Sequence, residues 1–408
     1  MPHKTDTIIL GNGGAACHAA MAARNAGFRG SIHMISDVDE AAFNPMLGPY
    51  YLKGKIPWEN CFPFGIEFYK QHDITCHFGS PVEELDAANH LIHCRDGKKF
   101  PYDQCLIATG ADPSFPFIPG LAECSRAYPV RNSKSIRELE KAMSGAEKLV
   151  ILGASLVGIK LAEIMRIRNP NAEILLVDVT DQVMPGGAHP ASADYLRKYF
   201  EQHGINIMLG CSMEGLEDDG NAICCFFPES LMQKADFVAV CTGIRPNISF
   251  VDKEQVEIDK AILIDKESRT SCEGLYAAGD CAQGINPLSG KREWLGTWGN
   301  ACYQGRVAGM RMAGKSQTFP GNPPQHVSPF FNWIYVQIGD ACRKGEGITY
   351  ETSGNPFEGA YRLLVYENNA LIGANLINDP NSIAPIKKAI LQRSSAPFEQ
   401  PPDPLLLV

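Results

Sequence analysis

The chain has 408 residues, of which 45% are hydrophobic, so it is long enough for about two or three domains with sizeable cores. Its formal net charge is −9 and its sequence pI is about 5.6, which disfavours binding to a nucleic-acid backbone or an anionic lipid surface. No apolar run approaches the roughly 20 residues of a membrane-spanning helix, and the N-terminus lacks a cleavable secretory pattern. We therefore expect a globular protein without nucleic-acid partners or a membrane span.

Two segments share the order strand, glycine turn, helix and second strand. The first runs from Thr7 to Asp37 and the second from Lys148 to Asp178. The first glycine of the turn and the closing aspartate are 26 positions apart in one segment (11 to 37) and 25 in the other (153 to 178). Two βαβ units of matching length predict two dinucleotide-binding sites.

The first turn reads Gly11-x-Gly13-x-x-Ala16. The first glycine permits a tight turn, the second lets backbone N–H groups approach a pyrophosphate, and the small third residue lets the helix pack close to the strand. The helix N-terminus adds partial positive charge. We expect Asp37 to accept the ribose 2′-hydroxyl, while Ser36, which occupies the strand-end position by count, is an alternative or a second contributor.

The second turn, Gly153-Ala-Ser155-Leu-Val-Gly158, has serine in place of the middle glycine. The serine narrows the approach to the backbone and offers a hydroxyl to a phosphate, and a packing turn without a ligand stays as the alternative. Asp178 favours NADH over NADPH, because a carboxylate accepts from a free 2′-hydroxyl and repels a 2′-phosphate. Residues 179–182 contain no arginine that would bind that phosphate.

Three later segments each read as a short apolar strand that stops at a glycine. They are residues 100–110, ending in Ala108-Thr109-Gly110, residues 234–243, ending in Thr242-Gly243, and residues 274–280, ending in Gly279-Asp280. Residues 298–313 are rich in small side chains and predict a helix that stops at Gly314.

The composition changes from about Phe319. A Pro-rich linker leads to an aromatic cluster at residues 330–335, and strand-like runs follow at 361–366 and 371–375. This pattern predicts a smaller α+β third domain. The last residues, 397–408, are Pro-rich and then apolar, and we interpret them as a loose or docking tail.

Fourteen cysteines are scattered along the chain without any C-x-x-C pair. That scatter argues against a zinc or iron–sulfur site built from this chain alone, so we expect no metal. Some lie in apolar strand-like runs, as Cys105 and Cys241 do, where a free thiol packs as a small hydrophobe. We interpret the cysteines as reduced thiols of a cytoplasmic protein.

Five motifs in this order resemble those of the FAD-dependent pyridine nucleotide-disulfide oxidoreductase superfamily, over residues 7 to about 313. They are Gly11-x-Gly13-x-x-Ala16, Ala108-Thr109-Gly110, Gly153 to Gly158, Thr242-Gly243 and Ala277-Ala278-Gly279-Asp280. Residues 43–52 and the C-terminal region resemble the rubredoxin reductase, ferredoxin reductase and assimilatory nitrite reductase branch. The resemblance implies an α/β fold with two Rossmann-like dinucleotide-binding domains, as in glutathione reductase, and a small α+β C-terminal domain.

An FAD-binding domain in two parts follows from the resemblance and the order of the segments. We expect its first part at residues 1–118 and its second part at 249–320, with the NAD-binding domain at 119–248 between them. A C-terminal α+β interface domain is expected at 321–394 and the Pro-rich tail at 395–408.

The resemblance also implies which residues contact the nucleotides. Asp280 is expected to hydrogen-bond the FAD ribityl chain, and Trp298 is either an aromatic residue beside the flavin or an ordinary core tryptophan. The expected FAD contacts are Gly11, Gly13, Gly14, Ala16, Ser36, Asp37, Thr109, Gly110, Gly279, Asp280 and Trp298. The expected NADH contacts are Gly153, Ser155, Leu156, Val157, Gly158, Asp178, Thr242 and Gly243.

Several positions depart from the family pattern. Met46 stands where single-cysteine NADH oxidases and coenzyme A-disulfide reductases carry their redox thiol, and a thioether forms neither a mixed disulfide nor a sulfenic acid. Pro49 stands where branch members have a lysine near the flavin N5, although Lys53 and Lys55 follow, and Lys53 is a candidate catalytic residue. Lys160 replaces a glutamate on the second nucleotide helix and is either a nicotinamide-side residue or a helix-surface charge.

Two nucleotide units without a thiol relay predict an FAD-dependent NADH oxidoreductase. In this hypothesis NADH passes hydride to FAD, and the reduced flavin passes electrons to rubredoxin, a ferredoxin or a partner subunit. Because the chain is acidic, attraction of an acidic acceptor needs a local basic patch, to which Lys387, Lys388 and Arg393 are candidates to contribute.

Two alternatives stay open. The first is an NADH oxidase or disulfide reductase that acts on a small molecule through an unrecognised cysteine, with Cys281, Cys61 and Cys17 as candidates, although we interpret Cys281 as a turn-packing thiol. The second is a flavin-holding subunit of a larger dehydrogenase, whose aromatic third domain and apolar end, Leu405 to Val408, form the interface. The sequence does not define the acceptor, the pathway or the oligomeric state, and a homodimer is one option.

Overall fold

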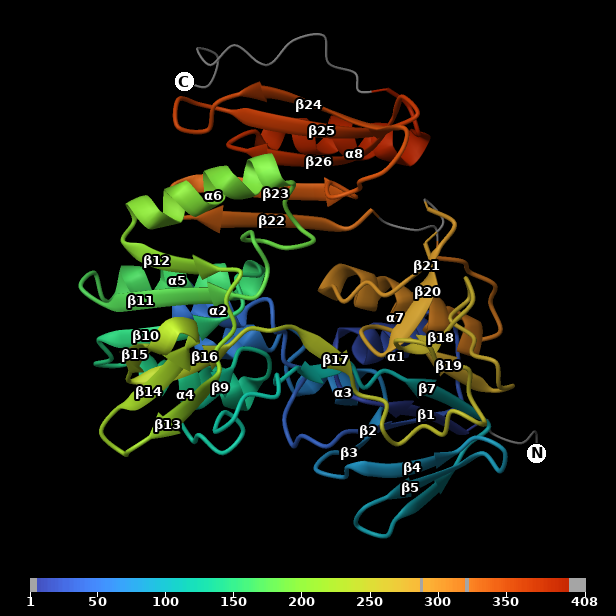
Figure 1. The fold of residues 1–408 in the computed structure, drawn as a ribbon. Coiled ribbons are helices and arrows are strands. Elements are labelled where there is room, and N and C mark those ends of the chain that lie inside the picture. The colour runs from blue at the N-terminus through green and yellow to red at the C-terminus, as the bar shows by residue number, and fades with distance from the viewer. Residues whose placement is uncertain (1–5, 287–288, 320–322, 396–408) are drawn as a thin grey trace, which may run out of the picture. The chain divides into compact units, whose positions relative to one another are not determined.

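The computed structural model describes residues 6–286, 289–319 and 323–395, which fold into two compact units (Figure 1). Unit 1 comprises Met1–Asp112 and Ile244–Asn322, and unit 2 comprises Pro113–Gly243 and Pro323–Val408. Among the helices that the structure describes, none has the length and apolarity needed to cross a membrane.

Unit 1 contains a five-stranded parallel sheet in the order β19-β7-β1-β2-β3. Ile8, Ile9 and Leu10 in its central strand are at most 2% exposed. Such continuous apolar strands occur where both faces of a parallel sheet are covered. The strands are β1 (Asp6–Leu10), β2 (Ser31–Ile35), β3 (Thr75–His77), β7 (Gln104–Ile107) and β19 (Leu275–Ala277).

Helices α1 (Gly14–Asn25) and α7 (Trp298–Met312) pack against each other on one face of this sheet. A Cβ on Gly305 of α7 would lie 2.1 Å from the Ala15 carbonyl oxygen, and one on Gly309 would lie 2.0 Å from that of Ala19. The two helix backbones therefore approach so closely that only glycine fits at these positions. The small residues from which both helices are predicted therefore also allow the two helices to pack closely.

A second sheet covers the opposite face of the parallel sheet. Its strands β4 (Val82–Asp86), β5 (Leu91–Cys94) and β6 (Lys99–Pro101) are antiparallel, and Leu85 and Ile92 pack with Ile8 and Leu10 of β1. The remaining elements, with β8 at the boundary of unit 1, are α2 (Gly48–Leu52), η1 (Trp58–Cys61), α3 (Glu67–Gln71), β8 (Ala111–Pro113), β17 (Ile244–Pro246), β18 (Ile262–Leu263), β20 (Ala282–Ile285) and β21 (Arg292–Glu293).

The sequence predicts one strand over residues 100–110, and this prediction is wrong. β6 and β7 are separate strands in different sheets, and between them the Asp103 N–H donates to the Asp6 carbonyl, 3.0 Å away. Within this apolar run, the chain passes from the antiparallel sheet to the parallel sheet. The same correction applies to residues 234–243, which contribute to both β15 (Leu231–Ala235) and β16 (Phe237–Val240).

Unit 2 contains another five-stranded parallel sheet, in the order β12-β11-β10-β16-β9. A three-stranded antiparallel sheet packs on it through Leu216, Ile223 and Phe227, which contact Val150 and Val238. The strands of the parallel sheet are β9 (Ala127–Pro129), β10 (Lys148–Leu152), β11 (Glu173–Asp178), β12 (Ile205–Leu209) and β16 (Phe237–Val240). The other elements are α4 (Ser133–Met143), α5 (Leu156–Arg168), α6 (Pro190–Gln202), β13 (Gly215–Asp218), β14 (Ile223–Phe227), η2 (Pro228–Ser230) and β15 (Leu231–Ala235).

The C-terminal part of unit 2 is a five-stranded antiparallel sheet in the order β22-β23-β26-β25-β24 (Figure 1). Asn368 and Asn369 link β25 to β26 with φ angles of 50° and 65°, as a type I′ hairpin turn requires. Tyr199 of α6 stacks on Trp333 with ring centroids 3.7 Å apart. The elements are β22 (Gln325–Phe330), β23 (Trp333–Gly339), β24 (Ile348–Gly354), β25 (Tyr361–Glu367), β26 (Ala370–Ile377), η3 (Pro380–Ser382) and α8 (Ile383–Gln392).

The predicted fold class is confirmed: two parallel-sheet dinucleotide-binding folds and a small sheet-rich C-terminal domain with one helix, α8, are present. Of the tail predicted at 395–408, all but Ser395 lies outside the described residues.

Candidate cofactor and substrate sites

The first glycine turn joins β1 to α1. The Gly11 N–H donates to the Ile35 carbonyl, 2.7 Å away, and a Cβ on Gly11 would lie 2.2 Å from the Ala108 carbonyl oxygen. At Gly13, by contrast, no described atom lies within 4 Å of an added Cβ. The fold itself therefore requires Gly11, whereas Gly13 leaves open the space in front of the turn.

The N-terminus of α1 is open to an anion. Gly13 is the N-cap, no side chain of the described residues caps the helix, and the first turn contains no acidic residue. The first backbone N–H groups and the positive end of the helix dipole are therefore available to a pyrophosphate. Ala16, fully buried in α1, fits the close packing expected of the third small residue.

Backbone pairing shows which residue closes the first unit. Gly11 N–H donates to Ile35, and Gly153 N–H donates to Val177 at the same distance of 2.7 Å. Ser36, the residue after Ile35, is therefore the structural equivalent of Asp178. Ser36 is 4% exposed, and its hydroxyl accepts from the Val38 N–H at 3.3 Å, whereas Asp37 is exposed one position further on.

The other residues predicted to contact FAD lie where neighbouring strands end. Thr109 and Gly110 follow β7, and its neighbour β19 is followed by Gly279 and Asp280, so all four lie at the carboxyl edge of the sheet beside the first turn. The Gly279 N–H donates to the Gln304 side chain of α7 at 2.9 Å. The structure thus brings these predicted residues together, supported by a glutamine that the sequence did not indicate.

Trp298 packs on the beginning of α1. A Cβ on Gly14 would lie 3.0 Å from two ring atoms of Trp298 and 3.1 Å from the Cys302 sulfur. Trp298 itself is half-buried and follows Thr297, whose hydroxyl accepts from the Asn300 N–H at the start of α7. The indole therefore lies next to the first glycine turn.

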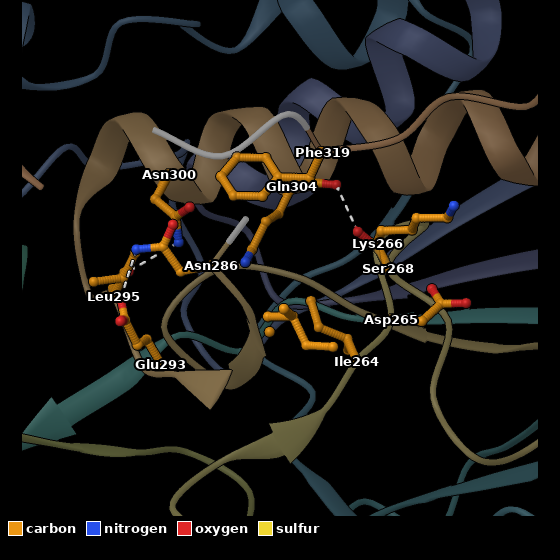
Figure 2. Close-up of a pocket in the computed structure, with 12 residues that line it drawn as sticks. Ile264, Asp265, Lys266, Ser268, Asn286, Glu293, Leu295, Asn300, Gln304 and Phe319 are labelled. Atoms are coloured by element: carbon orange, nitrogen blue, oxygen red, sulfur yellow. Dashed lines mark hydrogen bonds between the residues drawn. The ribbon is translucent and has the colours of Figure 1, made fainter. Parts of the chain in front are cut away.

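A small pocket beside α7 is separate from the residues at the first glycine turn and the neighbouring strand ends (Figure 2). Asn286 donates to Glu293 at 2.7 Å, and Asn300 donates to the Leu295 carbonyl at 2.9 Å. None of the residues predicted to contact FAD lines this pocket. Gln304, which lines this pocket, accepts from the N–H of Gly279, the residue before Asp280.

The second glycine turn joins β10 to α5 with the same geometry. A Cβ on Gly153 would lie 2.4 Å from the Cys241 carbonyl oxygen, and one on Gly158 would lie 1.9 Å from the Gly153 carbonyl oxygen. The Ser155 hydroxyl donates to the Cys241 carbonyl at 3.2 Å and does not cap the helix. The N-terminus of α5, which begins at Leu156 and Val157, therefore also fits a pyrophosphate.

Asp178 lies at the end of β11, directly beside this turn. One carboxylate oxygen accepts from the Ala154 N–H at 2.6 Å and the other from the Thr180 N–H at 2.8 Å. The second oxygen also accepts from the Thr180 hydroxyl at 2.8 Å, so it is the oxygen bonded to Ala154 that has capacity for a further hydrogen bond, from a ribose hydroxyl. The Asp178 side chain can therefore hold the turn and also contact the ribose.

Thr242 and Gly243 follow β16, whose neighbour is β10. The Thr242 hydroxyl donates to the Ser114 carbonyl at 2.6 Å, and the Ser114 N–H donates to the Gly243 carbonyl at 2.9 Å. Both predicted residues therefore lie at the carboxyl edge of the second sheet, fixed by a serine that the sequence did not single out.

The positions that depart from the family pattern differ in their surroundings. Met46 is 43% exposed just before α2, Lys53 is half-buried at the end of that helix, and Lys55 is exposed. Lys160 is 8% exposed, so its interpretation as a helix-surface charge is wrong. Burial, and then the charge of Lys160, lowers the pKa of His326 on β22.

All fourteen cysteines are free thiols. Cys17, Cys61 and Cys281 are fully buried, and burial raises the pKa of each. Since the thiolate is the reactive form, burial makes these three thiols poor nucleophiles. Among the described residues, no cluster of three or more histidine, cysteine or acidic side chains is placed to hold a metal ion.

Two open helix N-termini, each at the carboxyl edge of its own parallel sheet, define a flavin-dependent pyridine nucleotide oxidoreductase. Residues 5–305 match the family model described as pyridine nucleotide-disulphide oxidoreductase, and the chain belongs to this family. It binds FAD and oxidises NADH. The superfamily expected from the ordered motifs is confirmed, as is its rubredoxin and ferredoxin reductase branch.

Curated relatives resemble this chain along most of their length. An NADH oxidase of Methanocaldococcus jannaschii is 30% identical over 354 residues, covering 84% of this chain and 76% of the relative. The epsilon subunit of an NADH-dependent phenylglyoxylate dehydrogenase of Aromatoleum evansii is 28% identical over 349 residues, covering 85% and 82%. A rubredoxin-NAD(+) reductase of Ectopseudomonas oleovorans is 24% identical over 376 residues, covering 91% and 96%.

Solved structures share the fold. A putidaredoxin reductase in covalent complex with putidaredoxin matches with a TM-score of 0.87 at 21% identity, covering 95% of this chain and 93% of that chain. A water-forming NADH oxidase from Lactobacillus brevis matches with a TM-score of 0.90 at 19% identity, covering 98% and 94%. Likeness at this level of identity shows the architecture.

Proposed function

We propose that this protein passes electrons from NADH through FAD to a separate small redox protein of the rubredoxin or ferredoxin type. FAD, when bound, accepts a hydride from NADH and releases electrons to the acceptor. The chain's own residues bind the two nucleotides and orient them. Relatives named rubredoxin-NAD(+) reductase and ferredoxin–NAD(+) reductase component support this type of acceptor.

The observation that carries the proposal is the lack of a thiol where an internal relay would need one. Met46, an exposed thioether, precedes α2, and the next cysteine along the chain, Cys61, is fully buried with a raised pKa. A disulfide or peroxide reductase of the cysteine type needs an accessible thiolate. Electrons are therefore proposed to leave directly from the flavin.

In this proposal the residues at the first turn and its neighbouring strand ends hold FAD, and those at the second turn hold NADH. Lys53 is a candidate for contact with the flavin. The domain divisions at 1–118, 119–248, 249–320, 321–394 and 395–408 remain predictions. The free thiols favour a reducing compartment, and we place the protein in the cytoplasm.

Anaerobic stopped-flow mixing of the flavin-loaded protein with NADH tests the first half of the reaction. The flavin absorbance near about 450 nm is expected to bleach, and rubredoxin or ferredoxin to restore it faster than coenzyme A disulfide. A triple variant with Cys17, Cys61 and Cys281 changed to serine is expected to keep this turnover. Loss of turnover in that variant, at unchanged FAD content, would favour a thiol mechanism and overturn the proposal.

A second candidate function is membership of a larger dehydrogenase, supported by similarity to the epsilon subunit of the phenylglyoxylate enzyme over 85% of this chain. Affinity purification of the tagged full chain from its native cells distinguishes the two. Stoichiometric co-elution of other dehydrogenase subunits would support the assembly, whereas a homogeneous chain that reduces a free redox protein would exclude it. Size-exclusion chromatography of the same sample also reports whether the protein is a homodimer.

A further inference from the structure

The loop at residues 179–189, between β11 and α6, folds over the second glycine turn. The Met184 N–H donates to the Ala154 carbonyl at 2.8 Å, and the Ala154 N–H donates to Asp178 at 2.6 Å. The loop and its strand end thus hold both polar groups of Ala154, which is fully buried inside the turn. The shape of the turn depends on where this loop lies.

One side chain of the C-terminal sheet holds the far end of the loop. The Asn375 side chain, on β26, accepts from the His189 N–H at 2.8 Å and donates to the Gly187 carbonyl at 3.1 Å and to the Tyr335 hydroxyl at 2.9 Å. The Tyr335 hydroxyl donates to the same Gly187 carbonyl at 2.8 Å. The side-chain amide of Asn375 supplies an acceptor for the His189 N–H and a donor for the Gly187 carbonyl.

The two ends of the loop are connected by short internal bonds. The N–H groups of Gly187 and Ala188 both donate to the Met184 carbonyl at 2.9 Å, and the Gln182 side chain donates to the Ala188 carbonyl at 2.9 Å. A shift of Gly187 therefore displaces Met184, and with it the Ala154 peptide. Asn375 and Tyr335 are fully buried, so water cannot readily replace the bonds they make.

We propose that Asn375 is a positioning residue for NADH, acting through the 179–189 loop on the second glycine turn. The inference rests on the proposed binding of NADH at that turn, and it is independent of which acceptor receives the electrons. Asn375 holds the loop, the loop holds Ala154, and the turn then presents its N–H groups in one fixed geometry. The C-terminal sheet, which the sequence predicts as an interface domain, thereby also influences the affinity for NADH.

Rapid mixing of flavin-loaded Asn375→Ala protein with a series of NADH concentrations separates binding from hydride transfer. The apparent Kd for NADH is expected to rise about 5- to 20-fold, with the limiting rate of flavin bleaching within about 2-fold of the wild type. The FAD content is expected to be unchanged, because the first turn lies in another unit. The thermal shift that NAD⁺ causes should shrink in parallel, a readout that needs no turnover.

Ile386→Ala is the matched control, since Ile386 is fully buried on α8 and its hydrocarbon side chain forms no hydrogen bond to the loop. It should lower the unfolding temperature without changing the Kd. Tyr335→Phe provides a smaller change if Asn375→Ala fails to fold, and it is expected to raise the Kd in the same direction. An unchanged Kd in the Asn375 or Tyr335 variant, or an equal rise in Ile386→Ala, would overturn the inference. If NADH does not bleach the flavin of the wild-type protein, that result would instead refute the proposed function.

Discussion

Gly11 and Gly13 serve the first turn in different ways. Gly11 has φ of 104° and its Cβ would collide with Ala108, so substitution there prevents the turn from forming. Gly13 has an extended backbone with φ of −119° and open space in front of it. The fold tolerates a side chain at the second position, whereas a bound pyrophosphate does not.

Gly13→Ala is therefore expected to fold normally and to bind FAD at least about 10-fold more weakly, because the added methyl group occupies the approach to the helix N-terminus. Circular dichroism checks the fold and titration with FAD checks the affinity. Equal FAD affinity in the variant and the wild type would mean that the pyrophosphate does not lie in front of Gly13.

Asp178→Asn is expected to raise the KM for NADH by about 10-fold and to narrow the preference for NADH over NADPH. The amide removes one acceptor and the negative charge, and it places a donor near the N–H groups of Ala154 and Thr180. Steady-state kinetics with both nucleotides provide the measurement. Asp181→Asn, an exposed carboxylate three residues later, is the control, and an equal effect there would show that general charge is responsible.

At the level of elements, the contact between α1 and α7 fixes the position of the first turn. Gly305→Ala is expected to destabilise the protein by about 3 kcal/mol or more, because its methyl group would overlap the Ala15 carbonyl. Gly299, in the same helix, has no described atom within 4 Å of an added Cβ. Gly299→Ala should therefore stabilise the helix by about 0.5–1 kcal/mol. Thermal unfolding compares the two, and equal effects would contradict the close packing of the helices.

The strand pair β2 and β3 contains a proton-sensitive contact. His33 Nδ1 and His77 Nε2 lie 3.0 Å apart, so one ring nitrogen donates and the other accepts. Burial, and then the proximity of His33, lowers the pKa of His77 below its ordinary value of 6.5. The folded state therefore binds this proton less tightly than the unfolded chain, and stability falls as the pH drops from 6.5 through the folded pKa.

Chemical unfolding at a series of pH values between about 8 and 5 measures this effect. The unfolding free energy of the wild type should decline below about pH 6.5, and His77→Gln should flatten that decline. An identical slope in both proteins would assign the pH dependence to other groups.

The sequence predicts what local backbone geometry determines. Gly11 and Gly153 mark sharp turns at a fixed distance from the end of the next strand, and small residues mark the helices that pack closely. Both nucleotide-binding units can therefore be located from the sequence alone. Pairing between strands is different: counting from the first glycine favours Ser36, and the carboxylate favours Asp37. The hydrogen bond from Gly11 to Ile35 decides between them and makes Ser36 the counterpart of Asp178.

Long-range packing accounts for the other residues that the sequence did not indicate. The sequence leaves Lys160 as either a nicotinamide-side residue or a helix-surface charge, whereas the fold buries it. Asn375 lies 188 positions from Gly187 in the chain while donating to its carbonyl. Gln304 is one of several polar residues in α7, and its contact with Gly279 arises only when α7 packs on the sheet. Composition and motif spacing do not indicate contacts between residues that are far apart in the sequence.

For the whole molecule, the distribution of charge bears on the acceptor. Residues 380–395 contain Lys387, Lys388 and Arg393 and no acidic residue, in a chain of net charge −9. They lie on or directly after α8, where Lys388 and Arg393 are exposed. We therefore propose this helix as the local basic patch that attraction of an acidic redox protein requires.

The double variant Lys387→Glu with Lys388→Glu is expected to raise the KM for an acidic acceptor by about 10-fold and to weaken its dependence on salt. Flavin reduction by NADH should not change. Lys134→Glu on α4, an exposed lysine, is the control. Unchanged acceptor kinetics in the double variant would place docking on another surface.

The two glycine turns are closed by the same backbone hydrogen bond at the same distance, and in the proposed reaction FAD stays bound whereas NADH is exchanged in each cycle. This closing hydrogen bond therefore does not distinguish the two sites, although the turns differ at one position, where Ser155 replaces the middle glycine. What lies over each turn also differs: the indole of Trp298 and a helix packed through glycines over one, and a hydrogen-bonded loop over the other. We therefore expect changes in these covering elements to alter how long each nucleotide stays bound.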